Sequence, residues 1–95
     1  MNFKEYDRII KDHKYDMLFL EIYYNLTCDD TFKILSDKDK EILIHFIHRA
    51  YLKDENRLDL GYICDKAIEL KDEILKEDLN TWDFLGQCYI EKEEI

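Results

Sequence analysis

The chain has no proline and no valine, and its only glycines are Gly61 and Gly86. Proline and glycine mark most of the turns that join β-strands, so their scarcity argues against an all-β fold. The β-branched residues are almost all isoleucines at helical spacing. A length of 95 residues and a hydrophobic content of 46% fit one domain with its own core and exclude a disordered chain. We therefore expect a single all-α domain over residues 1–95.

The motifs of several enzyme classes are also missing. The sequence contains no glycine-rich phosphate loop, no Gly-x-Ser-x-Gly and no Cys-x-x-Cys. These patterns are typical of nucleotide-binding proteins, of serine hydrolases, and of zinc or thioredoxin-like sites. Of the three cysteines, Cys64 and Cys88 lie on apolar helix faces, and Cys28 precedes two acidic residues, so we expect inert thiols. The prediction is a protein that is not an enzyme and holds no cofactor.

No stretch of the sequence has the pattern of a secretory signal or of a membrane span. The N-terminus is charged from Lys4 onward, and the most apolar run, from Met17 to Leu26, is too short for a bilayer and contains Glu21. An odd number of cysteines without a signal peptide fits reduced thiols. These features predict a cytoplasmic protein. The abundance of residues with AT-rich codons suggests a low-GC bacterium or its phage as the source.

Apolar residues recur every three or four positions along most of the chain, which is the period of one helix face. Over residues 3–26 this pattern fits either one long helix or two helices with a break near residues 13–16. Residues 27–36 fit a turn with a short helix, which Asp29 or Asp30 can cap. The apolar side chains that we expect to point inward here are Phe32, Ile34 and Leu35.

Three further helices are predicted, over residues 37–53, 60–75 and 82–91. Ser36 followed by Asp39 is typical of a capping box at the start of the first of them. Asn80 or Thr81 can cap the last. The inner faces are predicted to carry Leu43, Phe46, Ile47, Ala50 and Tyr51; then Leu60, Ile63, Cys64, Ala67, Ile68, Leu70, Ile74 and Leu75; then Trp82, Leu85, Cys88 and Tyr89. Short connectors favour antiparallel neighbours, so the expected fold is a compact bundle of four to five antiparallel helices.

The net charge of −9 is concentrated in the last third of the chain. Residues 65–95 hold ten acidic residues and four lysines, which leaves −6. Such a protein is repelled by nucleic acid and by anionic membranes and is attracted to basic protein surfaces. We therefore expect a basic protein as the partner, with no direct binding of nucleic acid or membrane.

An acidic stripe is predicted along one side of the helix over residues 60–75. Successive acids in it are three or four residues apart, and four residues advance a helix by about 6 Å, close to the phosphate spacing of a nucleic-acid strand. The stripe consists of Asp65, Glu69, Asp72 and Glu73 along one side of this helix, with Glu77 beyond its end. The alternative is a solvated helix face with ordinary ion pairs, since three lysines interleave with the acids: Lys66, Lys71 and Lys76.

The segment from Met17 to Leu26 is apolar at eight of its ten positions, which is more than one helix face can hold. One interpretation is that this segment forms the central helix of the bundle. The other is that part of it, Phe19 and Tyr23, contacts a partner or a second copy of the chain. Tyrosine is common in protein interfaces, which supports the second interpretation.

A weak metal-site candidate lies on the helix over residues 37–53. Glu41, His45 and His48 are spaced so that they can point the same way. The sequence has only one such cluster, whereas di-iron bundles need a Glu-x-x-His motif on each of two helices. The prediction is therefore that these histidines lie on the surface or at the core edge, and that the protein holds no metal.

Together these features predict a non-catalytic protein-binding module. Its most concrete form is a small acidic inhibitor that occludes a basic nucleic-acid-binding protein or nuclease. In size and acidity alone, the chain resembles the anti-CRISPR inhibitors encoded by phages and the immunity proteins of nucleases. The alternative is a structural or regulatory homodimer that buries the Met17–Leu26 segment between two copies.

Overall fold

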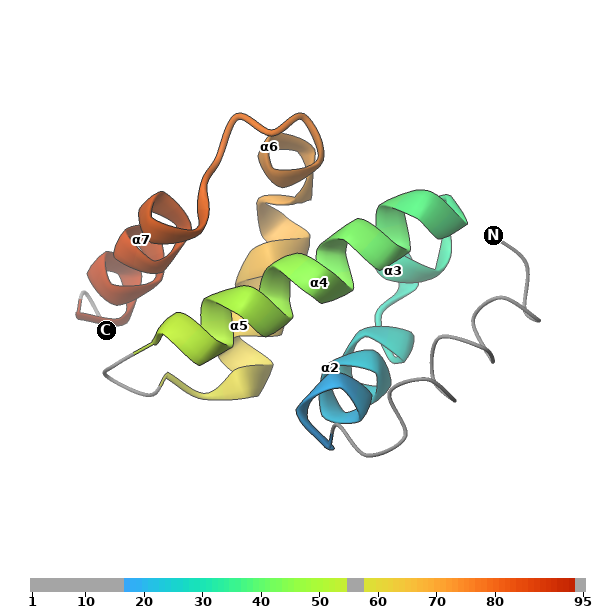
Figure 1. Ribbon diagram of the computed structural model, residues 1–95, viewed down its shortest axis with the longest axis horizontal. Helices are drawn as coiled ribbons and strands as arrows, with labels where there is room; N and C mark the ends of the chain where they lie inside the picture. Colours follow the sequence, from blue (N-terminus) through green and yellow to red (C-terminus); the bar gives the residue numbers. More distant parts are fainter. Residues whose placement is uncertain (1–16, 55–57, 94–95) are drawn as a thin grey trace.

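The computed structural model describes residues 17–54 and 58–93 of the chain. Within these residues the protein is all-α, with six helices and no strand, which confirms the predicted fold class (Figure 1). The helices are α2 (Met17–Thr27), α3 (Asp30–Lys33), α4 (Asp37–Lys53), α5 (Leu60–Glu69), α6 (Lys71–Leu75) and α7 (Thr81–Glu93). The possible break near residues 13–16 lies outside the described residues.

Helix α4 has the predicted bounds and lies at the centre of the fold. Its start is fixed by Ser36, whose hydroxyl accepts a hydrogen bond from the backbone N–H of Asp39 (3.2 Å). It contacts α2, α5, α6 and α7, and Figure 1 shows it crossing the middle of the molecule. The central helix is therefore α4 and not the segment from Met17 to Leu26. The buried side chains of α4 are Leu43, Ile44, Phe46, Ile47 and Ala50.

Two further helix starts have the predicted side-chain caps. The Asp29 carboxylate accepts a hydrogen bond from the Phe32 N–H (3.1 Å) at the start of α3. The Asn80 side-chain oxygen accepts one from the Asp83 N–H (2.9 Å) at the start of α7. Both contacts satisfy an N–H group that has no partner inside its helix.

Helix α2 packs against α4 and α5, and it also contacts α3. The side chains of α2 that enter the core are Phe19, Ile22 and Leu26. Phe32 is buried and Leu35 half-buried, as predicted, but Ile34 is 84% exposed. The inward prediction for Ile34 is wrong because Ile34 keeps a helical backbone conformation and lies two residues, about 200°, from the buried Phe32, so it faces solvent.

The helix predicted over residues 60–75 is interrupted at Leu70. This residue has φ −99° and ψ 15°, outside the helical range, and it separates α5 from α6. Figure 1 shows α6 turned away from the axis of α5. The break buries Ile74 and brings α6 into contact with α4. No proline or glycine lies at this point, so packing against α4 explains the break better than local sequence does.

The inner face of α7 differs from the prediction by one residue. Leu85 and Cys88 are buried as expected, but Trp82 is 62% exposed and Phe84 is fully buried instead. Two residues rotate a helix by about 200°, so Trp82 and Phe84 face opposite ways. Burying Phe84 therefore leaves Trp82 in solvent.

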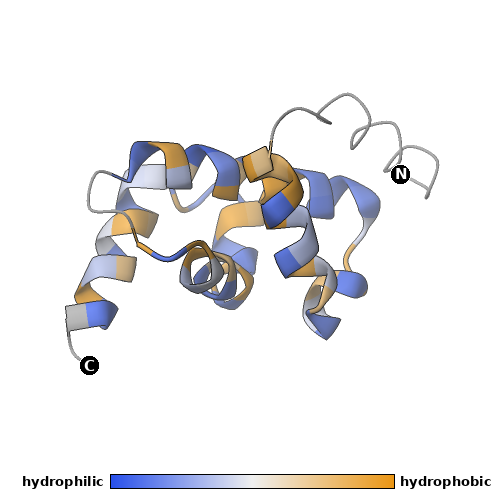
Figure 2. Ribbon diagram, turned by 90° about the horizontal axis from the view of Figure 1, so that it is seen from below, coloured by the Kyte–Doolittle hydropathy of each residue, from blue (hydrophilic) through white to orange (hydrophobic). Residues whose placement is uncertain are grey.

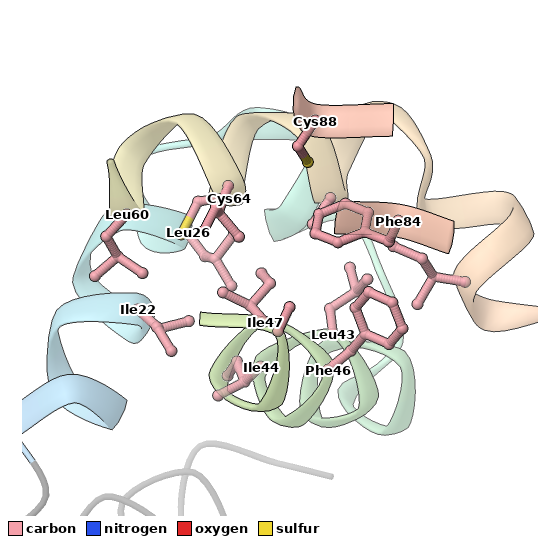
Figure 3. Close-up of a cluster of buried hydrophobic side chains, with 14 of the residues drawn as sticks. Ile22, Leu26, Leu43, Ile44, Phe46, Ile47, Leu60, Cys64, Phe84 and Cys88 are labelled. Carbon is pink, nitrogen blue, oxygen red and sulfur yellow. The ribbon is translucent and has the colours of Figure 1, made fainter. Parts of the chain in front are cut away.

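The buried side chains of α2, α4, α5 and α7 meet in one core (Figure 3). Phe46 of α4 packs edge-on against Phe84 of α7, with 5.2 Å between the ring centroids. Figure 2 shows hydrophobic and hydrophilic residues on the same helices, as expected for amphipathic helices around a shared core. In the described part of the chain, no helix has the length and apolarity to cross a membrane.

A buried carboxylate ties the end of α4 to α7. Asp54 accepts hydrogen bonds from the backbone N–H of Leu58 and from the hydroxyl of Tyr89. Both Asp54 and Leu58 are buried. The carboxylate thus satisfies two donors that come from segments far apart in the sequence.

Candidate functional site

The predicted acidic stripe does not lie along a single helix. Asp65 and Glu69 belong to α5, Asp72 and Glu73 to α6, and Glu77 follows α6. All five side chains are exposed. Because the chain bends at Leu70, the phosphate-like spacing expected over the whole stripe is wrong. What remains is an exposed acidic segment that follows the bend.

Lys66 was predicted on a solvated face of the same helix, but its side chain is only 3% exposed. Its ammonium group donates hydrogen bonds to Glu91 of α7 and to Glu69 (3.4 Å). Burial lowers the pKa of Lys66, but the hydrogen bond to Glu91 and the charge of Glu69 outweigh it, so this pKa lies above its ordinary value. The positive charge of Lys66 therefore partly neutralises the Glu69 carboxylate.

The other acidic residues of the stripe are less neutralised by the protein itself than Glu69 is. Asp72 forms an exposed ion pair with Lys71 (3.0 Å), which contributes little in water. Asp65, Glu73 and Glu77 form no ion pair with any residue of the described ranges. These three carboxylates define what we call the acidic surface of α5 and α6.

Glu77 has an unusual backbone conformation, with φ 62° in the left-handed region. The N–H of Asp78 bonds to the carbonyl of Glu73 (3.0 Å), and the N–H of Glu77 bonds to that of Ile74 (3.1 Å). These two bonds form a Schellman motif, in which Glu77 holds the position that glycine usually occupies. A charged side chain stays exposed there at a conformational cost of about 1–2 kcal/mol.

We expect the substitution Glu77→Gly to stabilise the protein by about 0.5–1 kcal/mol, because glycine adopts positive φ without strain. Urea denaturation followed by circular dichroism measures this change. The matched control is Lys76→Gly, since Lys76 has φ −86° and gains nothing from glycine. That variant should lose stability. Equal effects of the two substitutions would contradict the conformational explanation.

The structure separates the two predicted contact residues of α2. Phe19 is 1% exposed, and its ring packs near those of His45 and His48, at 5.8 and 6.4 Å between centroids. The prediction of Phe19 as a partner-binding residue is therefore wrong, because the core of its own chain uses it. Tyr23 is half-buried against the same core. The exposed apolar groups of α2 are Met17 and Tyr24.

The weak metal candidate does not form a ligand set. Glu41 and His45 approach each other, with 3.8 Å between Oε1 and Nε2, and His48 packs near Phe19 as described above. Among the described residues, no group of three histidine, cysteine or acidic side chains is placed to hold a metal ion.

The thiols differ in exposure. Cys64 and Cys88 are buried, and burial raises the pKa of Cys64 to about 12 and that of Cys88 to about 11. At neutral pH both remain protonated, so neither has the thiolate that a nucleophile needs. This agrees with the prediction of inert thiols at these two positions. Cys28 is exposed.

Comparison of the chain with models of protein families, with functionally characterised proteins and with solved structures finds no match in any of the three.

Proposed function

We propose that this protein is a non-catalytic protein-binding module, and most concretely an acidic inhibitor that occludes a basic nucleic-acid-binding protein or nuclease. The observation that carries the proposal is the acidic surface of α5 and α6, where Asp65, Glu73 and Glu77 are exposed and form no ion pair within the described residues. In a chain of net charge −9, this surface presents carboxylates that remain available to a cationic partner.

The physical basis is long-range charge attraction rather than a copy of phosphate spacing. Complementary charge accelerates the encounter of two proteins, and this attraction weakens as salt screens it. A surface that binds nucleic acid is rich in lysine and arginine and is therefore a favourable target. A strained backbone at Glu77 that keeps a carboxylate exposed is consistent with a binding role for that charge.

The test compares two variants with the same change in net charge. Asp65→Lys/Glu73→Lys alters the acidic surface, whereas Glu21→Lys/Asp30→Lys alters exposed acids on α2 and α3. Each tagged chain captures proteins from an extract of the source cells at low salt, and quantitative mass spectrometry identifies them. We expect the wild type and the control to retain the same basic protein. The variant Asp65→Lys/Glu73→Lys should retain less of this protein by a factor of about ten or more.

Equal recovery with both variants would show that net charge alone, and not the acidic surface, determines binding. Recovery of only the chain itself would support the homodimer instead and would contradict the inhibitor proposal. Sedimentation at micromolar concentration then measures the homodimer directly.

A further inference from the structure

A groove lies between α4 and the segment that runs from the end of α6 to the start of α7. Its volume is about 430 Å³, within the range of small-ligand and side-chain pockets. The floor is apolar, because Phe46 and Ile74 are buried beneath it, and the half-buried Leu79 adds to it. The groove therefore lies over the edge of the core and is open to solvent.

The rim of the groove carries large exposed apolar groups. Ile42 of α4 and Trp82 of α7 both line it and are both exposed. Trp82 is the only tryptophan in the chain, and nothing in the packing of α7 requires a large aromatic side chain at a solvent position. Tryptophan at a concave surface is typical of residues that contribute strongly to binding.

Two cations lie on the same groove, in an otherwise acidic molecule. Arg49 and Lys53 are one turn apart on α4, and the Lys53 ammonium lies 5.4 Å from the centroid of the Trp82 ring. Neither forms an ion pair with any residue in the ranges that the structure describes. The protein thus leaves two positive charges beside an apolar floor, although acidic residues outnumber basic ones by 23 to 14.

We infer that this groove binds a short segment of a partner protein that presents an apolar side chain next to a carboxylate. The apolar side chain would pack against the exposed Ile42 and Trp82, and the carboxylate would pair with Arg49 and Lys53. Charge complementarity selects this occupant. A polyanion such as a nucleic-acid strand is disfavoured, because Glu77 lines the groove as well and would repel it. The groove shares Glu77 with the acidic surface of the proposed function, and its other lining residues lie outside that surface.

The experiment selects ligands from a phage-displayed library of short random peptides on the immobilised full-length chain. We expect enriched peptides that combine aspartate or glutamate with an apolar residue. Because Trp82 is the single tryptophan, binding of a synthetic enriched peptide should shift the fluorescence of the chain to shorter wavelength in a saturable way. Arg49→Glu/Lys53→Glu should weaken binding roughly tenfold, or by a larger factor.

A matched control carries the same change in charge elsewhere. Lys33→Glu/Lys38→Glu alters two exposed lysines outside the groove and should bind the peptide as the wild type does. Trp82→Ala, which removes the aromatic ring and is measured by calorimetry because it also removes the fluorophore, should weaken binding too. The inference is overturned if no peptide is enriched, if enriched peptides lack acidic residues, or if both charge variants bind equally. Saturable binding of a single-stranded oligonucleotide, or of a second copy of the chain, in this groove would also overturn the inference.

Discussion

The substitution Phe84→Ala is expected to destabilise the protein by about 3–5 kcal/mol. Phe84 is fully buried and joins α7 to the central helix through the edge-on contact with Phe46. Its removal loses apolar burial and leaves a cavity that the surrounding helices fill only in part. Because small domains are stable by about 5–15 kcal/mol in total, this one change removes a large share of the folding free energy. Urea denaturation followed by far-ultraviolet circular dichroism measures it.

The control for this prediction lies two residues earlier on the same helix. Trp82 is a larger side chain, but it is mostly exposed, so Trp82→Ala should cost less than about 1 kcal/mol. A sequence-based estimate from size alone would predict the reverse order. If Trp82→Ala proved more destabilising than Phe84→Ala, the described orientation of α7 would be wrong.

The second large effect is expected at Asp54. Replacement by alanine leaves the Leu58 N–H and the Tyr89 hydroxyl without their shared acceptor, at a cost of about 3 kcal/mol in the free energy of unfolding. Tyr89→Phe removes only one of these donors and should cost about 1 kcal/mol, because the Leu58 contact remains. Chemical denaturation of both single variants and of the double variant measures the coupling.

The double variant Asp54→Ala/Tyr89→Phe should lose less unfolding free energy than the two single variants lose together, since both single changes disrupt the same hydrogen-bond network. Strict additivity would show that the Tyr89 hydroxyl and the Asp54 carboxylate do not interact.

The bounds of helix α4 could be predicted because the signals for them are local, although the inner-face pattern missed the buried Ile44. The Ser36 cap precedes an uninterrupted apolar period, and the observed bounds equal the predicted ones. At the starts of α3 and α7 the sequence offered two neighbouring caps each, and the structure selects Asp29 and Asn80, each of which accepts from a backbone N–H three residues away. Residues whose role depends on their neighbours in sequence can be assigned from sequence.

The failures share a different cause, which is contact between distant segments. The break at Leu70 has no proline or glycine to mark it. The burial of Lys66 depends on Glu91, and the choice of Phe84 over Trp82 for the core depends on the position of Phe46. The groove beside Trp82 exists only because the segment after α6 folds back onto α4. Periodicity describes a single helix, so it cannot reveal these contacts.

For the candidate site, the sequence correctly indicated an exposed acidic segment. It did not show which of the acidic residues form ion pairs within the protein. It could not distinguish Glu69, which Lys66 partly neutralises, from Asp65 and Glu73, which form no ion pair in the described ranges. This distinction determines which residues to substitute, because charge reversal at Asp65 and Glu73 removes available negative charge without breaking an ion pair within the protein.

The measurement that tests the central proposal most directly is displacement from DNA-cellulose. An extract of the source cells is loaded on the resin, and the bound proteins are then exposed to the wild-type chain or to Asp65→Lys/Glu73→Lys. We expect the wild type to release a basic nucleic-acid-binding protein as a complex and the variant to leave it on the resin. If the wild type released nothing, or if both chains released the same proteins, the acidic surface would not be an inhibitor of nucleic-acid binding.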